Sequence, residues 1–341
     1  MHSCPGNAGP DYDRCVRALL EVQELIVELP TPAGWIRPVN EVSLRIGAGD
    51  SLGLVGESGS GKTMLSLALM GLLPEGARVK GRAALGSNGE TRELLSLDER
   101  GWRGVRGRKI AMIFQEPMTS LNPVMRVGAQ IEEAIRAHEP ALSAKEIQSR
   151  SIEALRRAAV PEPEARAGQF PHQLSGGLRQ RAMIAMALAA GPRLLIADEP
   201  TTALDVTVQK EVLELLARLR GELRVGLLFI THDLGVVAQV AERVAVMYAG
   251  RIVEEGPVRE VLRAPRHPYT QGLLRASPRL ERGNLHPIPG TVPRLGAPPS
   301  GCAFGPRCEL VRPECREAVP ALRTVSGQHA AACVLARSGE V

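Results

Sequence analysis

Aromatic side chains are scarce in this chain of 341 residues, where Phe, Trp and Tyr together make up 3 %. Lysine is rare as well, with five residues, and 42 basic against 37 acidic side chains leave a net charge of only +5. Nucleic-acid-binding surfaces combine basic patches with aromatic side chains that stack on bases. The sequence has no basic run with interleaved aromatics, so it gives no support for a nucleic-acid partner.

Long hydrophobic runs are missing too. A membrane-spanning helix needs roughly eighteen or more apolar residues in succession. The longest candidate, 182–197, is interrupted by Gly191, Pro192 and Arg193. The N-terminal residues lack the basic region and apolar core of a secretion signal. We therefore expect a cytosolic protein that reaches a membrane only through its partners.

Four of the six cysteines lie near the C-terminus. Cys4 and Cys15 are isolated, and the other four are Cys302, Cys308, Cys315 and Cys333. In a reducing cytosol such a group predicts metal ligands rather than disulfides. Thiolates bind both zinc and iron–sulfur clusters, although the sequence has no Cys-x-x-Cys pair of an ordinary zinc knuckle. The pattern leaves both metals open, with free thiols as the alternative.

Strand and helix patterns alternate over residues 20–262. Strands are predicted at 20–27, 42–46, 194–197 and 227–230, and helices at 64–73, 127–137, 144–159 and 178–190. We therefore expect an α/β domain over residues 19–262 with a helical subdomain at about 120–190. Residues 1–18 predict a flexible tail. The proline-rich residues 263–341 predict a small, irregular C-terminal extension.

The most informative stretch reads Gly56, Glu57, Ser58, Gly59, Ser60, Gly61, Lys62, Thr63. It follows an apolar run typical of a strand and precedes a helical pattern. Glycines let such a loop wrap closely, so that its backbone N–H groups and the helix N-terminus point at a phosphate chain. The Lys62 ammonium then binds the β- and γ-phosphates, and the Thr63 hydroxyl binds Mg²⁺. These residues predict a site for a nucleoside triphosphate.

Polar side chains follow three more predicted strands. Asp198 and Glu199 end one apolar run, His232 follows a second and Gln115 a third. Because the carboxyl ends of parallel strands meet at one edge of a sheet, we expect these side chains beside the phosphate loop. Asp198 is suited to hold Mg²⁺, Glu199 to act as general base, and Gln115 to bind Mg²⁺ or orient water. A lone histidine is more often structural. We assign His232 a functional role only because it follows a strand that is expected to end at this edge of the sheet.

A second anion-binding helix start is predicted at Ser175, Gly176 and Gly177, before the helical pattern at 178–190. The simpler interpretation is a capped helix. One ATP needs only one phosphate loop, however. A second phosphate-binding segment therefore predicts a site shared between two subunits.

In this order, the motifs resemble those of the ATP-binding cassette (ABC) ATPases over roughly residues 20–262. The matching segments are Gly56–Thr63, Gln115, Leu174–Gln180, Leu194–Glu199, Ala203–Asp205 and His232. The resemblance implies a P-loop NTPase fold with a mostly parallel sheet, an antiparallel β subdomain and a helical signature subdomain. It also implies a head-to-tail dimer with two sandwiched ATP molecules, in which Ser175 and Gly177 act on the partner's ATP. Glu199 is then the base, His232 holds the γ-phosphate, and Asp205 belongs to the nucleotide site.

A closer resemblance, to the peptide and nickel importer branch of this family, covers the whole chain. It rests on 112–123 and 197–209, and on 266–270 and 287–302 for the branch's C-terminal extension. Within the branch the chain is similar to the first, D-type ATPase. The resemblance implies ATP-driven peptide import at the cytoplasmic face of the membrane. The implied partners are a second ATPase subunit, two permeases and an extracytoplasmic substrate-binding protein. The segment after Gln115 would transmit dimer closure to the permeases. Import of nickel or another small solute is the alternative, followed by a soluble ATPase outside transport.

The adenine contact departs from the family pattern. Members usually stack adenine on an aromatic residue after the first strand, and the aligned position here is Leu29. Trp35 either takes over this stacking or covers the sheet edge.

Similar extensions include members that carry a [4Fe–4S] cluster. The resemblance therefore implies a cluster at the four C-terminal cysteines, ahead of zinc or free thiols. His329 is then either an outer-shell partner of the cluster or a surface histidine.

Overall fold

The computed structural model describes residues 18–87, 90–115, 120–202, 204–277, 286–293, 296 and 300–337. The predicted tail with Cys4 and Cys15 lies outside these residues except for residue 18. Residues 116–119, in the segment after Gln115, and Ala203, in the segment before Asp205, lie outside them as well.

The main sheet brings the carboxyl ends of its parallel strands to one edge. Among the described residues it has eight strands in the order β11-β12-β10-β9-β3-β8-β7-β6. Strands β9, β3, β8, β7 and β6 are parallel, whereas β10 and β12 run antiparallel to their neighbours. The bounds are β3 Ser51–Val55, β6 Ile110–Ile113, β7 Leu194–Asp198, β8 Gly226–Thr231, β9 Arg243–Tyr248, β10 Arg251–Pro257, β11 Arg323–Ser326 and β12 His329–Ala331. The predicted α/β class is confirmed.

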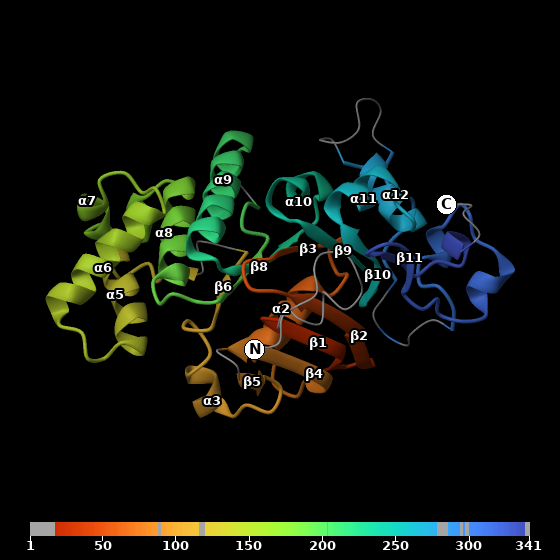
Figure 1. Cartoon of the computed structure of the whole chain (residues 1–341), viewed down its shortest axis with the longest axis horizontal. Helices are drawn as coiled ribbons and strands as arrows, with labels where there is room; N and C mark the ends of the chain where they lie inside the picture. Colours follow the sequence, from red (N-terminus) through yellow and green to blue (C-terminus); the bar gives the residue numbers. More distant parts are fainter. Residues whose placement is uncertain are drawn as a thin grey trace, which may run out of the picture.

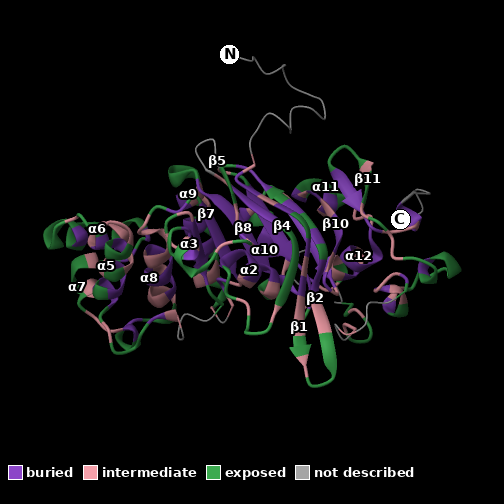
Figure 2. Cartoon of the chain, turned by 90° about the horizontal axis from the view of Figure 1, so that it is seen from below, coloured by how far each residue is buried: buried purple, intermediate pink, exposed green. Residues whose placement is uncertain are grey.

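Successive side chains of these strands enter two different cores. Ile196 packs with α2 (Lys62–Met70) and the antiparallel sheet, whereas Ala197 packs on the opposite face with α8 (Gly176–Leu188), α9 (Val206–Leu223) and α10 (Leu234–Val240). Alternation follows from the two-residue period of a strand. Because both faces are covered, the strands read as continuous apolar runs. Figure 2 shows them as the most continuous buried part of the chain.

A second, antiparallel sheet has the order β2-β1-β4-β5. Its strands are β1 Leu20–Thr31, β2 Gly34–Ile46, β4 Arg78–Ser87 and β5 Glu90–Glu93, and α3 (Glu99–Arg103) follows it. The first two strands are longer than predicted, because pairing continues to Thr31 and Gly34 through Pro30 and Pro38. Proline is tolerated at both positions: β2 is an edge strand, and Pro30 lies beyond the last residue of β1 that pairs with β4.

The helical subdomain and the C-terminal extension lie at opposite ends of the molecule (Figure 1). The subdomain contains α5 Val127–His138, α6 Ala144–Arg157, α7 Pro163–Ala167, the short 3₁₀ turn Pro171–Gln173 and α8. The predicted positions are confirmed to within three residues. Helix α8 begins earlier than predicted because the Ser175 side chain caps it, and α2 ends earlier because Gly71 has a left-handed φ of 62°.

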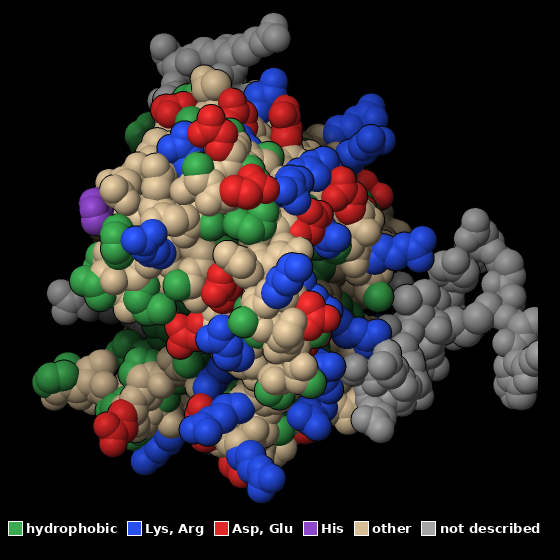
Figure 3. Space-filling view, turned by 90° about the vertical axis from the view of Figure 1, so that its left-hand side faces the viewer, with side chains coloured by type: hydrophobic (Ala, Val, Ile, Leu, Met, Phe, Trp, Pro, Cys, Tyr) green, Lys and Arg blue, Asp and Glu red, His purple; other side chains and the backbone are tan. Residues whose placement is uncertain are grey.

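Acidic and basic side chains are interspersed on the face formed by the helical subdomain (Figure 3). Several form ion pairs, such as Arg156 with Glu153 and Glu164, and Arg150 with Glu139. Among the described residues of this face, charges of the two signs are therefore mixed rather than gathered into a patch of one sign. No helix in the described ranges has the length and apolar character needed to cross a bilayer.

The C-terminal extension is joined to the ATPase domain by backbone pairing. Helices α11 (Val258–Arg263) and α12 (Pro268–Arg275) are followed by 3₁₀ turns at Gly305–Arg307, Pro313–Arg316 and Leu335–Arg337. Strand β12 then pairs with β10 through Glu254↔Ala331 and Glu255↔Ala330. The extension thereby adds β12 and β11 to the main sheet, which the irregular composition of this region did not indicate.

Candidate functional site

The glycine-rich loop connects β3 to α2, as predicted. Gly61 has a φ of 107°, and a Cβ at this position would lie 1.9 Å from the carbonyl oxygen of Pro38. A Cβ at Gly56 would lie 2.2 Å from the carbonyl oxygen of Met247. Only glycine fits at either position, because backbone carbonyl groups of strands β2 and β9 lie too close to the loop to leave room for a side chain.

Lys62 is buried at the mouth of this loop. Its Nζ donates hydrogen bonds to the carbonyl oxygens of Gly56 at 2.7 Å and Glu57 at 3.0 Å. Burial lowers the pKa of the Lys62 ammonium, while the negative charges of Glu199 and Asp198 oppose that effect. The ammonium is thus held over the loop by weak carbonyl partners that a phosphate can replace.

Asp198 ends strand β7 with its carboxylate almost fully buried. Its Oδ2 lies 3.5 Å from the Ser66 hydroxyl, and Oδ1 has no hydrogen-bond partner within the described residues. Burial raises the pKa of the Asp198 carboxyl, opposed by a hydrogen bond from the Thr63 side chain. A buried acceptor without a partner beside a hydroxyl suits a hard cation such as Mg²⁺. Thr63 and Asp198 therefore fit the predicted magnesium ligands.

Three donor groups converge on one carboxylate oxygen of Glu199. Its Oε2 lies 2.9 Å from Thr202 Oγ1, 3.3 Å from His232 Nδ1 and 3.4 Å from Gln115 Nε2. The His232 contact lowers the pKa of Glu199, and the same contact raises the pKa of His232. Glu199 also has a left-handed φ of 45°, a strained conformation for a residue with a side chain. The structure thus joins three residues predicted from three separate strands, and adds Thr202.

The helix start at Ser175, Gly176 and Gly177, which we call the signature segment, lies apart from the phosphate loop of the same chain. Ser175 Oγ accepts a 3.4 Å hydrogen bond from Leu178 N–H at the start of α8, and a Cβ at Gly177 would lie 2.8 Å from Val208 Cγ1. Asp205 in turn caps α9 by accepting from Val208 N–H at 2.9 Å. Figures 1 and 2 both place α8 in the helical subdomain, away from α2. Ser175, Gly176, Gly177 and Asp205 therefore form one structural unit that does not meet Lys62 within the chain.

Trp35 lies near the tip of the β1–β2 hairpin, opposite Pro30, and is 43 % exposed. The Arg78 guanidinium lies 3.9 Å from the centre of its ring. Leu29 pairs with Ile36 in the same hairpin. One face of the Trp35 ring is thus covered by the Arg78 guanidinium.

The four C-terminal cysteines line one small cavity together with His267. Burial raises the pKa of the Cys302 thiol to about 11, against hydrogen bonds from Phe304 and Gly305 N–H. In the part of the chain that the structure describes, no three His, Cys, Asp or Glu side chains are grouped as ligands of a single metal ion. The cysteines are therefore neighbours without forming a cage for one ion.

His329 is not a surface histidine. It is buried, and its Nε2 lies 2.7 Å from Glu254 Oε1. Glu254 also accepts hydrogen bonds from the backbone N–H groups of Arg266 and His267. This pair ties the extension to strand β10.

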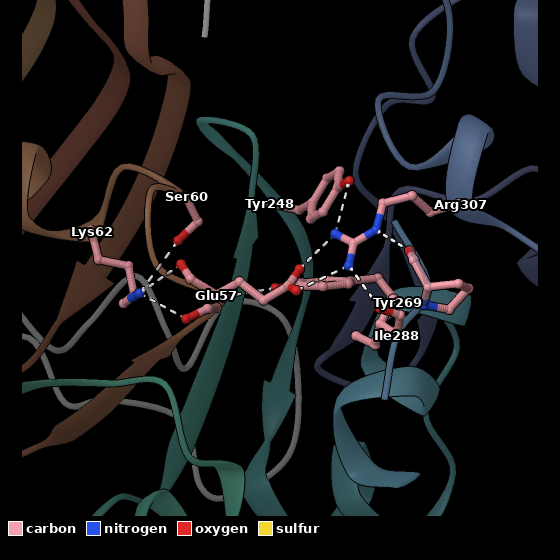
Figure 4. Close-up of polar contacts among 9 residues, drawn as sticks. Glu57, Ser60, Lys62, Tyr248, Tyr269, Ile288 and Arg307 are labelled. Carbon is pink, nitrogen blue, oxygen red and sulfur yellow. Dashed lines mark hydrogen bonds and ion pairs between the residues drawn. The ribbon is translucent and has the colours of Figure 1, made fainter. Parts of the chain in front are cut away.

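Sequence reasoning missed two residues that contact the phosphate loop from the extension. Arg307 forms a two-pronged ion pair with Glu57, and the Tyr269 hydroxyl accepts a hydrogen bond from Glu57 N–H (Figure 4). Arg307 directly precedes Cys308, but no local pattern links either residue to a loop whose Glu57 lies 212 residues before Tyr269 and 250 before Arg307.

Comparisons with known proteins agree with this geometry. The family described as ABC transporter matches residues 39–202, and the family described as oligopeptide/dipeptide transporter, C-terminal region, matches residues 253–315. The oligopeptide transport ATP-binding protein OppD of Bacillus subtilis is 48 % identical over 92 % of this chain and 88 % of its own length. The dipeptide transport ATP-binding protein DppD of Haemophilus influenzae is 46 % identical over 91 % of this chain and 94 % of its own.

Among solved structures, the ATP-binding cassette MJ0796, described as a dimer in a post-hydrolysis state with ADP and Pi, superposes with a TM-score of 0.62. It is 27 % identical in sequence, and the superposition covers 70 % of this chain and 99 % of the MJ0796 chain. The fold, the assembled motifs and these relatives agree: the chain belongs to the ABC transporter family of ATP-binding proteins, in the branch that carries the oligopeptide/dipeptide transporter C-terminal region.

Proposed function

We propose that this chain is the ATP-hydrolysing subunit of an importer for peptides. The observation that carries the proposal is the convergence of Lys62, Asp198, Glu199 and His232 where parallel strands end. Relatives named for oligopeptide and dipeptide transport support the cargo class.

Hydrolysis follows from the positions of these side chains. The loop N–H groups and Lys62 are placed to bind the phosphates, and Thr63 and Asp198 would hold Mg²⁺, which would supply positive charge beside the phosphate oxygens. Glu199 is ionised because its pKa is lowered, and it accepts a proton from the attacking water. Gln115 and His232, both in contact with Glu199, orient that water and the γ-phosphate. Catalysis therefore rests on positioning and charge stabilisation.

The complete ATP site needs a second subunit. Ser175, Gly176 and Gly177 present a capped helix start with backbone N–H groups, a ready site for phosphate oxygens. Because this segment lies apart from the chain's own phosphate loop, we assign it to the ATP of a partner ATPase in a head-to-tail heterodimer. Asp205, linked to the same unit through Val208, lines the shared interface.

Energy from dimer closure then passes to two membrane permeases fed by a substrate-binding protein. On this proposal the chain is held at the cytoplasmic face of the membrane by the permeases, and the segment that follows Gln115 contacts them. Peptide specificity resides in the binding protein, because the ATPase does not touch the cargo.

The four cysteines are proposed to hold a [4Fe–4S] cluster, with zinc as the alternative. All four border one cavity, and backbone N–H groups donate to the sulfurs of Cys302, Cys308 and Cys333, hydrogen bonds of the kind that tune the reduction potential of a cluster. His267 also lines this cavity; its Nδ1 accepts from Tyr269 N–H, so the ring proton is on Nε2, which has no partner within the described ranges.

A deletion strain tests the transport function. Cells lacking this chain should lose uptake of labelled di- or oligopeptides, and wild-type protein should restore it, whereas Glu199→Gln should not. Uptake of labelled nickel is measured in parallel. Loss of nickel uptake with normal peptide uptake would transfer the proposal to the alternative cargo.

A further inference from the structure

The C-terminal extension holds the second residue of the phosphate loop by its side chain. Arg307 Nη1 lies 2.7 Å from Glu57 Oε2, and Arg307 Nη2 lies 3.0 Å from Glu57 Oε1. The pair is two-pronged, and the Arg307 side chain is only 4 % exposed. Two parallel charge-assisted hydrogen bonds fix the direction of a carboxylate far better than a single surface ion pair does.

Arg307 is itself held from several sides. Its Nε donates to the carbonyl oxygen of Pro289 at 2.8 Å, and Nη2 also lies 3.4 Å from the carbonyl oxygen of Ile288. The guanidinium lies within 6 Å of the ring centres of Tyr248 and Phe304. Because these contacts fix the guanidinium, little side-chain entropy is lost when it binds Glu57.

The backbone of Glu57 is held by the extension as well. Its N–H donates to the hydroxyl of Tyr269 at 2.8 Å, and Tyr269 is fully buried in helix α12 against Tyr248 and Phe304. The carbonyl oxygen of Glu57 accepts a hydrogen bond from Lys62 Nζ. Figure 4 shows Glu57 between Lys62 on one side and Arg307 on the other. One residue therefore carries both the contacts of the extension and a contact of the phosphate-binding lysine.

We propose that Arg307 and Tyr269 are positioning residues of the ATP site, through which the C-terminal extension sets the affinity of the phosphate loop for ATP. Neither residue needs to touch the nucleotide. Both fix the orientation of the Glu57 peptide. They thereby also fix the loop carbonyl oxygens that accept hydrogen bonds from Lys62. The inference rests on the proposed ATPase function and adds a role for the extension in it.

The same geometry links the loop to the cysteine cavity. Arg307 ends the turn Gly305–Arg307, which lies between Cys302 and Cys308. Any change at these thiols that shifts the turn also moves the guanidinium. Since coupling between two binding sites is reciprocal, ATP should in turn alter the environment of the cysteines.

Equilibrium binding of a fluorescent ATP analogue to the full chain, with Mg²⁺, tests the proposal. Arg307→Met and Glu57→Gln should each weaken binding by roughly tenfold, the scale of a lost charge-assisted contact. The double variant should bind no more weakly than the weaker single variant, because both changes remove one interaction. The matched control is Arg323→Met, which changes an exposed arginine of β11 and should leave the affinity unchanged.

Two further variants guard against simple misfolding. Tyr269→Phe removes only a hydroxyl and should weaken binding by about threefold. The charge exchange Glu57→Arg with Arg307→Glu should recover part of the affinity lost in either single exchange, which a purely structural role would not predict. Wild-type affinity in both Arg307→Met and Tyr269→Phe would overturn the inference, as would additive losses in the double variant. If the wild-type chain binds no nucleotide, the proposed function fails instead.

Discussion

Nδ1 of His232 lies 3.3 Å from Oε2 of Glu199, although the two residues are 33 positions apart in the sequence. They meet because β7 and β8 are parallel neighbours that end at the same level, with Asp198 opposite Ile230. The contact places a carboxylate and an imidazole beside the phosphate loop, and several consequences can be measured.

The Glu199→Gln variant should bind ATP with wild-type affinity but hydrolyse it about a hundredfold or more slowly, because an amide cannot accept the proton from water. Steady-state turnover and nucleotide binding are compared in the assembled transporter. Glu211→Gln, on the exposed surface of α9, serves as the control. Unchanged turnover would remove Glu199 from the role of base.

The stability contributed by the Glu199–His232 pair should depend on pH. The folded pKa of Glu199 is lowered below its ordinary 4.5, and that of His232 is raised above its ordinary 6.5. The Glu199 contribution is present above pH 4.5 and is lost as the pH falls through the lowered value. The His232 contribution is present below pH 6.5 and is lost as the pH rises through the raised value. The difference in melting temperature between wild type and His232→Gln should therefore be largest between these limits. A difference that grew steadily from pH 6.5 to pH 9 would contradict the pairing.

Gly61→Ala should weaken ATP binding by more than about tenfold, because a left-handed φ costs about 1–2 kcal/mol and the added Cβ also meets the Pro38 carbonyl. Gly34→Ala is a matched control. Its φ of 110° is similar, but a Cβ there meets nothing within 4 Å. Equal losses of ATP affinity in the two variants, measured by equilibrium binding of a fluorescent ATP analogue, would show that the close approach to Pro38 contributes nothing.

His329→Leu should lower the free energy of unfolding by about 3–5 kcal/mol, because it leaves the carboxylate of Glu254 buried without its side-chain partner. Urea denaturation measures the change. Gln328→Leu, at the exposed neighbouring position, should have little effect. A loss below about 1 kcal/mol in His329→Leu would mean that Glu254 is satisfied by its backbone donors alone.

Anaerobically purified protein should contain about four iron and four sulfide ions per chain and absorb broadly in the visible range. Cys315→Ser should abolish both signals, whereas substitution of any cysteine outside the group of four should not. Stoichiometric zinc without sulfide would refute the cluster and support the alternative metal.

The chemistry of the phosphate loop could be predicted from the sequence because the residues that form it are neighbours along the chain. A strand, a glycine-rich turn and a helix start are consecutive, so the positions of Gly61, Lys62 and Thr63 follow from eight residues. The order of apolar runs that end in Asp198, Glu199 and His232 likewise indicated a shared sheet edge, which the parallel pairing explains.

Strand lengths and the place of the extension could not be predicted in this way. Strands were predicted at 20–27 and 42–46, but pairing continues to Thr31 and Gly34, and β2 forms an edge where the missing N–H group of Pro38 costs nothing. The residues around His329 looked irregular, yet they pair with β10 and bury Glu254.

The sequence by itself determined which groups gather around the phosphate loop, because those groups are set by residue type at fixed spacing along short segments. Only the tertiary structure decided that Arg307 and Tyr269 reach Glu57 across 250 and 212 positions. The physical reason is that such contacts depend on how α12 and the turn before Cys308 pack against Tyr248 and Phe304, and packing between distant segments has no local pattern.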